Sequence, residues 1–178
     1  MKQYKKETLV ETALLVVDVQ KSLLDEGPWN AEGVLTAIER VSAAARAAEA
    51  PIVFVRDLGV VPDGELSPRL TVLAGDVVVE KSYCDSFLGT DLLSQLQFKG
   101  VKRLVVAGMQ TDYCIDTTCR RAASLGFNVV LVADAHTTVD HEHLQAEQIV
   151  AHHNRILRRL SASEGSVTVL KSTEIVFA

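Results

Sequence analysis

The stretch Leu104-Val-Val-Ala-Gly108-Met-Gln-Thr-Asp-Tyr-Cys114 changes character halfway along its length. The continuous apolar run that ends at Gly108 is typical of a strand that is buried on both faces of a parallel sheet. A short polar turn follows, and a helical pattern begins around Cys114. The stretch therefore predicts a thiol at a helix N-terminus, directly beyond the carboxyl end of a strand.

Five further runs have strand character, and helical patterns separate most of them. The six expected strands are Ala13–Asp18, Ile52–Arg56, Val77–Glu80, Arg103–Ala107, Asn128–Ala133 and Val167–Leu170. Their alternation with helices predicts an α/β protein, with a three-layer α/β/α fold and a doubly wound, mostly parallel six-stranded sheet. A chain of 178 residues without a linker-like segment is expected to form a single domain over residues 1–178.

Capping and breaking residues mark the expected helix boundaries. Asn30, Thr90 and Asp140 are expected to cap helices, the last of which extends to about Leu160. The segment Leu58–Ala74, with Pro62, Gly64 and Pro68, is expected to be a long loop.

Composition excludes several classes of partner. The chain has 23 acidic and 18 basic residues, a net charge of −5, so nucleic acid is not expected as a partner. Its three cysteines show no CxxC spacing, which predicts neither a disulfide framework nor a zinc knuckle. No apolar run approaches the ~18 residues of a membrane span or forms a signal-peptide core. A cytoplasmic protein with reduced thiols and no membrane contact is expected.

Three reactive side chains follow three of the expected strands. Asp18, Lys81 and Cys114 each lie at a carboxyl strand end, where ligands bind in open parallel sheets. A helix N-terminus favours the thiolate, a carboxylate can move the thiol proton, and an ammonium stabilises negative charge. Each residue has an ordinary alternative: a buried apolar cysteine, a loop-capping aspartate and a surface lysine. Together they predict a nucleophilic site, with the backbone N–H groups of Gln110 and Cys114 as the expected oxyanion hole.

Four fragments in this order resemble the isochorismatase-like cysteine hydrolase superfamily. They are Leu14-Leu-Val-Val-Asp18-Val-Gln20, the segment from Lys81 to Thr90, the segment from Gly108 to Thr118, and Ala133-Asp-Ala-His-Thr-Thr138. The stretch that follows Asp112 and the tail His152-His-Asn are similar to the streptothricin-hydrolase-like branch.

The resemblance implies roles for the three side chains. Cys114 is implied to be the catalytic nucleophile, Asp18 the general base and acid, and Lys81 the third member of the triad. A non-proline cis peptide is implied at Met109–Gln110. The resemblance also implies a homodimer or homotetramer, and apolar patches on Leu144–Leu160 would fit such an interface.

The chain departs from its metal-dependent relatives. Nicotinamidases of the superfamily hold a metal with an Asp and two His after the second strand, and residues 53–74 here contain no histidine. All five histidines lie between His136 and His153, at spacings that do not converge on one helical face. We therefore expect no metal and no other cofactor.

Four residues near the expected triad are candidates for binding a small-molecule substrate. Gln20 follows Asp18 closely and is expected to orient it, while Tyr83 and Tyr113 neighbour triad members. Trp29, in the loop after the first strand, is expected to be either a pocket wall or an interface residue. Cys84 and Cys119 are expected to be packing residues.

These features predict a cysteine-dependent hydrolase that cleaves a small amide or lactam C–N bond through a thioester. Two alternatives remain open. One is hydrolysis of a vinyl ether in an isochorismate-like substrate, and the other is a non-catalytic binding or redox-sensing protein that retains the thiol.

Overall fold

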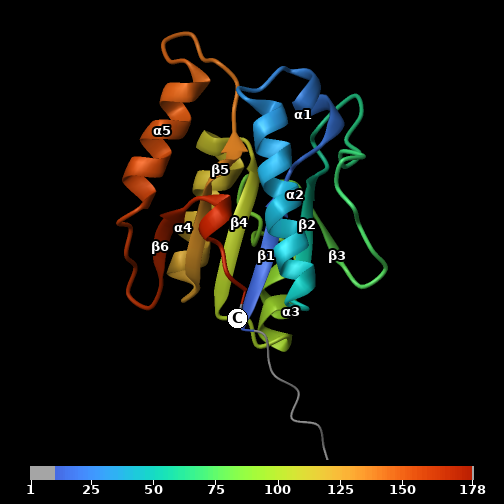
Figure 1. Ribbon diagram of the computed structural model, residues 1–178, viewed down its shortest axis with the longest axis vertical. Coiled ribbons are helices and arrows are strands. Elements are labelled where there is room, and N and C mark those ends of the chain that lie inside the picture. Colours follow the sequence, from blue (N-terminus) through green and yellow to red (C-terminus); the bar gives the residue numbers. More distant parts are fainter. Residues whose placement is uncertain (1–10, 178) are drawn as a thin grey trace, which may run out of the picture.

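The six expected strands all form in the computed structural model, which describes residues 11–177. They are β1 (Thr12–Val17), β2 (Ile52–Asp57), β3 (Val77–Lys81), β4 (Arg103–Met109), β5 (Asn128–Thr137) and β6 (Ser166–Leu170). The sheet order is β3-β2-β1-β4-β5-β6, and every neighbouring pair is parallel (Figure 1). Residues 1–10 and Ala178 of the expected single domain lie outside the described residues.

Helices cover both faces of the sheet. The longest helix, α2 (Ala31–Ala47), packs on one face together with the short η2 turn (Ser172–Glu174). The other face is covered by α3 (Leu92–Phe98), α4 (Asp116–Ser124) and α5 (Ala146–Leu157). Leu14 and Val16 of β1 contribute to the core beneath α2, while Leu15 and Val17 contribute to the opposite core. The three-layer α/β/α prediction is confirmed.

Helix starts differ in detail from the sequence expectation. Asn30 precedes α2 in a left-handed conformation, with φ of 50°, and its side chain makes no capping bond. Helix α5 begins only at Ala146, because Asp140 accepts the Ala146 N–H at 2.7 Å across an intervening loop. It ends at Leu157 rather than near Leu160. A short helix, α1 (Lys21–Asp25), was not expected.

The loop between β2 and β3 lies against the segment that follows β1. A single antiparallel bridge joins Gln20 to Leu66, and the Ser67 N–H donates to the Val19 carbonyl at 2.8 Å. The expected long loop is confirmed, and these bonds fix one side of it beside the end of β1.

The centre of the sheet is a topological switch point. The chain leaves β1 toward β2 and leaves β4 toward β5, in opposite directions along the sheet. Gly108 pairs with Val17 there, and a Cβ at Gly108 would stand 1.9 Å from the Val17 carbonyl oxygen. A glycine is therefore required for β1 and β4 to approach so closely just before Asp18 and Cys114. This is the place where an open α/β sheet binds its ligands.

No helix within residues 11–177 has the length and apolar character needed to cross a membrane.

Candidate active site

Asp18, Lys81 and Cys114 converge at this switch point. The Lys81 Nζ lies 2.7 Å from Asp18 Oδ2 and 3.3 Å from Cys114 Sγ. The Lys81 side chain is fully buried, and the Asp18 side chain is 1% exposed. Asp18 and Cys114 line a cleft of about 310 Å³. The three strand ends chosen from the sequence therefore meet in one place.

A fourth residue, Asp57, belongs to the same cluster and was missed from the sequence. Its Oδ2 lies 2.8 Å from Lys81 Nζ, while its Oδ1 accepts the Gly59 N–H at 2.7 Å. Asp57 ends β2, in register with Lys81 on β3. The rule that selected the other strand-end residues, a polar side chain at a carboxyl strand end, would have identified Asp57 as well.

The backbone presents the Asp18 carboxylate directly after β1. Asp18 has a positive φ of 51°, a conformation that aspartate adopts more readily than most residues. Its Oδ1 is buried and has no hydrogen-bond partner among the described residues. The other oxygen, Oδ2, carries the ion pair with Lys81.

Burial and charge set the protonation states of the cluster. Burial raises the pKa of Asp18 to about 6, although the Lys81 ammonium acts in the opposite direction. Burial alone would lower the pKa of Lys81, but its bonds to Asp18 and Asp57 raise the pKa above the usual range. Near pH 7.5 Asp18 is therefore ionised and Lys81 is protonated.

The Cys114 thiol differs from the sequence expectation. Burial, and then the neighbouring Asp18 carboxylate, raise the pKa of Cys114 above its ordinary value, against the influence of Lys81. The position at a helix N-terminus does not outweigh these two effects, so the expected lowering of the Cys114 pKa is wrong. In the resting site the proton is on sulfur, and Asp18 is the group placed to remove it.

Cys114 lies in an unusual turn. Residues Thr111–Ile115 form one turn of π-helix ahead of α4, and the Ile115 N–H donates to the Gln110 carbonyl. The peptide bond Met109–Gln110 is cis, as the resemblance implied. Gln110 lines the cleft beside Cys114, and its Nε2 donates to Glu26 at 2.9 Å. Both expected oxyanion-hole residues are thus at the cleft, and that role stays a prediction.

A buried histidine fixes the start of this turn. His136 is fully buried at the end of β5, with Nδ1 2.9 Å from Thr111 Oγ1 and Nε2 3.1 Å from Asn154 Oδ1. Burial lowers the pKa of His136 to about 4, so the ring is neutral. Thr138 adds a bond from its Oγ1 to Asp112 at 2.7 Å. The fragment Ala133–Thr138 therefore positions the turn that carries Cys114.

A second support holds the segment after β3. Thr118, one helical turn beyond Cys114, is fully buried and lies 2.8 Å from Ser86 Oγ. Its hydroxyl also donates to the Cys84 carbonyl at 3.3 Å. These bonds hold Cys84 at the cleft wall, where it lies exposed.

The four expected substrate-binding residues differ in whether they line the Cys114 cleft. Tyr113 lines the cleft. Trp29 instead lines a separate cavity with Glu26 and Asp140, and Tyr83 is exposed and is not among the residues that line the cleft. Trp29 and Tyr83 therefore do not line the Cys114 cleft, and the interface role expected as the alternative for Trp29 stays a prediction.

Gln20 also departs from its expected role. It is fully buried; its Nε2 donates to the carbonyls of Asp57 and Gly64, and its Oε1 accepts the Asp57 N–H. The side chain orients Asp57 and the loop beyond it rather than Asp18 or a substrate.

The cluster also contains the one group of potential metal ligands found among residues 11–177. Ligand atoms of Asp18, Asp57 and Cys114 all lie within 4.8 Å of one another. The Lys81 Nζ is in contact with all three residues, so an ammonium already provides the positive charge that a cation would bring. The donor set therefore does not favour a resident metal.

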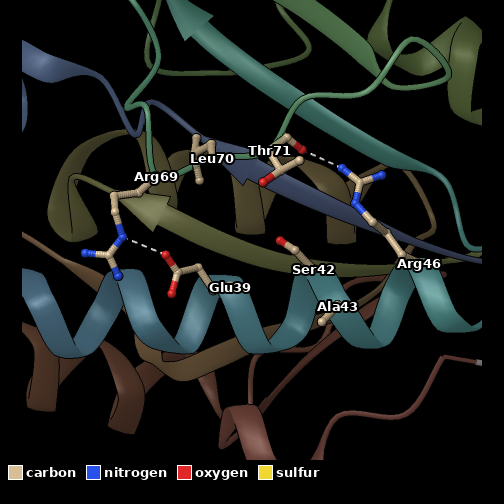
Figure 2. A pocket seen from close by; sticks show the side chains of 7 residues that line it. All are labelled: Glu39, Ser42, Ala43, Arg46, Arg69, Leu70 and Thr71. Carbon is tan, nitrogen blue, oxygen red and sulfur yellow. Dashed lines mark hydrogen bonds and ion pairs between the residues drawn. The ribbon is translucent and has the colours of Figure 1, made fainter.

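A different pocket, of about 210 Å³, lies between α2 and the β2–β3 loop (Figure 2). Arg69 is paired there with Glu39 at 2.6 Å, and Arg46 donates to the Thr71 carbonyl and to Asp76. Both guanidinium groups are engaged, and neither a cysteine nor a histidine lines this pocket, so it lacks the thiol and the base found around Cys114.

Comparison with known proteins agrees with the geometry. A family model described as Isochorismatase domain matches residues 12–162. The chain belongs to the isochorismatase family.

Relatives of this isochorismatase-family chain include both short and longer proteins. The uncharacterized isochorismatase family protein YddQ of Bacillus subtilis is 31% identical over 181 residues, which cover 92% of this chain and 97% of that protein. A streptothricin hydrolase of Streptomyces noursei is 36% identical over 138 residues, covering 72% of this chain and 50% of the relative. An isochorismatase crystal structure from Pseudomonas putida superimposes with a TM-score of 0.85 at 28% identity, covering 97% of this chain and 94% of that one. Hydrolases of this family share the fold described above.

Proposed function

We propose that this protein hydrolyses an amide or lactam C–N bond in a small molecule, with Cys114 as the nucleophile. The observation that carries the proposal is the contact of one buried ammonium, Lys81, with both Asp18 and the Cys114 sulfur on the floor of a cleft. A carboxylate close to the thiol, the thiol itself and a fixed cation are the groups that acyl transfer to sulfur requires. The similarity to a streptothricin hydrolase supports the same class of reaction.

In the first half of the proposed reaction, Asp18 takes the proton from Cys114 as sulfur attacks the carbonyl carbon. The N–H groups of Gln110 and Cys114 donate hydrogen bonds to the oxyanion that develops on the carbonyl oxygen. Asp18 then gives its proton to the departing nitrogen, and the C–N bond breaks to leave a thioester.

In the second half, Asp18 takes a proton from water as the water oxygen attacks the thioester carbonyl. The C–S bond breaks, the acid product forms, and the proton returns from Asp18 to Cys114. Lys81 stays protonated throughout and offsets the negative charge that moves among Asp18, sulfur and the oxyanion. The pKa of about 6 for Asp18 suits a group that both accepts and returns a proton near neutral pH.

A panel of small amides and lactams tests the proposal, with release of ammonia or amine as the readout. Cys114→Ala and Asp18→Asn should each abolish release. A panel member that carries a vinyl ether, followed by release of its carbonyl product, distinguishes the alternative reaction, which Cys114→Ala would retain and Asp18→Asn would lose. Oxidation of Cys114 by peroxide without turnover of any substrate would instead favour the redox-sensing alternative.

The expected assembly and location remain proposals. Leu144 and Ile156, within the stretch Leu144–Leu160 proposed for a homodimer or homotetramer, are exposed in the single chain. Light scattering coupled to gel filtration would measure the stoichiometry. The absence of a nucleic-acid partner and a cytoplasmic location also stay predictions.

A further inference from the structure

We propose that the Cys114 cleft selects substrates that are neutral or positively charged near the scissile bond and rejects those that carry a carboxylate there. This inference rests on the proposed function, because it assigns a substrate class to the same site. It follows from the charges of the groups that a bound molecule would meet.

The ionisable side chains that line the cleft include two carboxylates and no basic group. The carboxylates are Asp18 and Asp57, and the cysteines Cys84 and Cys114 lie beside them. The remaining lining residues are Leu23, Gly59, Val60, Gln110 and Tyr113. Among these side chains a substrate carboxylate would meet apolar, amide, thiol, phenol and anionic groups, and no cationic one.

The buried Lys81 ammonium does not make the charge around the cleft positive. Lys81 is fully buried, and its ammonium contacts both Asp18 and Asp57 at 2.7 and 2.8 Å. Two carboxylates and one ammonium leave the cluster with an excess of one negative charge when Asp18 is ionised. A carboxylate brought into the cleft would be desolvated without a free counterion, which is costly.

Basic side chains close to the site also form ion pairs with carboxylates. Arg56, next to Asp57 in the chain, pairs with Glu65 and Glu80, and Arg121 lies 3.6 Å from Asp85. His141, whose ring centroid is 6.0 Å from that of the cleft residue Tyr113, lies 3.1 Å from Asp112. Each of these three side chains has a carboxylate partner, although the buried Nε of Arg56 makes no hydrogen bond within residues 11–177.

A further negative charge, on Glu26, lies close to the Cys114 cleft. Glu26 is exposed and accepts the Gln110 side-chain N–H at 2.9 Å, so it adds negative potential where a substrate would lie beside Cys114. The same potential opposes an isochorismate-like dicarboxylate, the substrate type of the vinyl ether alternative. A neutral amide, or one with an ammonium or guanidinium group, meets no such opposition.

Three thiol reagents of different charge test the proposal without requiring turnover. Methyl, 2-aminoethyl and 2-sulfonatoethyl methanethiosulfonate each form a disulfide with the Cys114 sulfur and release methanesulfinate. Their rates are measured at pH 7.5 and low salt in a Cys84→Ser background, with peptide mapping of Cys114. Each rate is divided by the rate of the same reagent with N-acetylcysteine amide, an uncharged model thiol.

We expect the normalised rate of the cationic reagent to exceed that of the anionic reagent by about tenfold or more, with the neutral reagent between them. The ratio should fall as salt is raised to 0.5 M, because salt screens charge. Glu26→Gln, which removes the charge and keeps an acceptor for Gln110, should lower the ratio severalfold. Glu164→Gln, an exposed change just before β6 at the opposite end of the sheet, is the matched control and should leave the ratio unchanged.

Equal normalised rates, or a faster anionic reagent, would overturn the proposal. A ratio that is the same in Glu26→Gln and in Glu164→Gln would exclude the assigned contribution of Glu26. Because the ratio comes from labelling, it is measured even if no amide is turned over, and failure of the proposed function would appear separately in the Cys114→Ala assay.

Discussion

The ammonium of Lys81 lies 2.8 Å from the carboxylate of Asp57, a residue on the neighbouring strand and in register with it. Asp57 is in turn fixed by Gln20, which bonds to both its backbone N–H and its backbone carbonyl. Lys81 therefore has two carboxylate partners, of which Asp18 faces the thiol and Asp57 holds the ammonium from the side of β2. Asp57 is therefore a positioning residue, and its replacement should change the pH dependence of activity.

Asp57→Asn should shift the pH dependence of activity. The Asp57 charge contributes to raising the pKa of Asp18, so its removal should lower that pKa. The acid limb of kcat/KM should move below pH 6, and kcat at pH 7.5 should fall by about 10-fold as Lys81 loses one anchor. Asp85→Asn, which neutralises a carboxylate paired with Arg121, is the control. A reduced rate with an unmoved acid limb would show that Asp57 has only a structural role.

The native enzyme should lose activity as the pH falls through about 6. Asp18 must be ionised to accept the thiol proton, and its pKa is raised from 3.8 to about 6. The folded protein binds this proton more tightly than the unfolded chain does, so this group stabilises the fold as the pH falls from 6 toward 3.8. A loss of kcat/KM at pH 5 with an unchanged far-UV spectrum would agree with the assignment. Activity that is flat from pH 7.5 to pH 5 would contradict it.

Gln20→Met should destabilise the fold rather than alter substrate binding directly. The change removes three buried hydrogen bonds and leaves the partners on Asp57 and Gly64 unsatisfied. The free energy of unfolding should fall by about 2–4 kcal/mol. Urea denaturation measures it, and Gln97→Met on the exposed side of α3 serves as the control with little expected change. Equal stability of the two variants would exclude the role assigned to Gln20.

His136 should make the fold sensitive to acid. Its pKa is lowered from 6.5 to about 4, so between these values the unfolded chain binds a proton that the folded protein does not. This group therefore removes stability as the pH falls below 6.5. His136→Gln should be less stable at pH 7.5 but should lose less stability between pH 7.5 and 5. Because Asp18 is present in both proteins, the difference between their pH profiles isolates His136, and parallel profiles would contradict the assignment.

The sequence predicted the sheet well, because continuous apolar runs report strands that are buried on both faces. It also located Asp18, Lys81 and Cys114, since the carboxyl ends of parallel strands meet at one edge. It failed for Gln20, because the left-handed turn at Asp18 redirects the chain and brings the Gln20 side chain beneath the β2–β3 loop.

The protonation state of Cys114 could not be obtained from local sequence either. The position at a helix start predicts a stabilised thiolate, whereas the buried carboxylate of Asp18 comes from a segment almost a hundred residues away. Such effects depend on distances between strand ends, and no local pattern contains them. The same holds for Trp29, whose loop leads into a neighbouring cavity instead of the cleft.

The most direct test of the account is the turnover of the best amide found in the panel by two matched cysteine variants, Cys114→Ala and Cys84→Ala. Both cysteines line the cleft, but only the Cys114 sulfur contacts Lys81. We expect Cys114→Ala to lower amine release by at least about a thousandfold. Cys84→Ala should retain most of the activity, and the acid-quenched native protein should carry the acyl group on the Cys114 peptide. Amine release at a comparable rate by folded Cys114→Ala would contradict the central claim that Cys114 is the nucleophile.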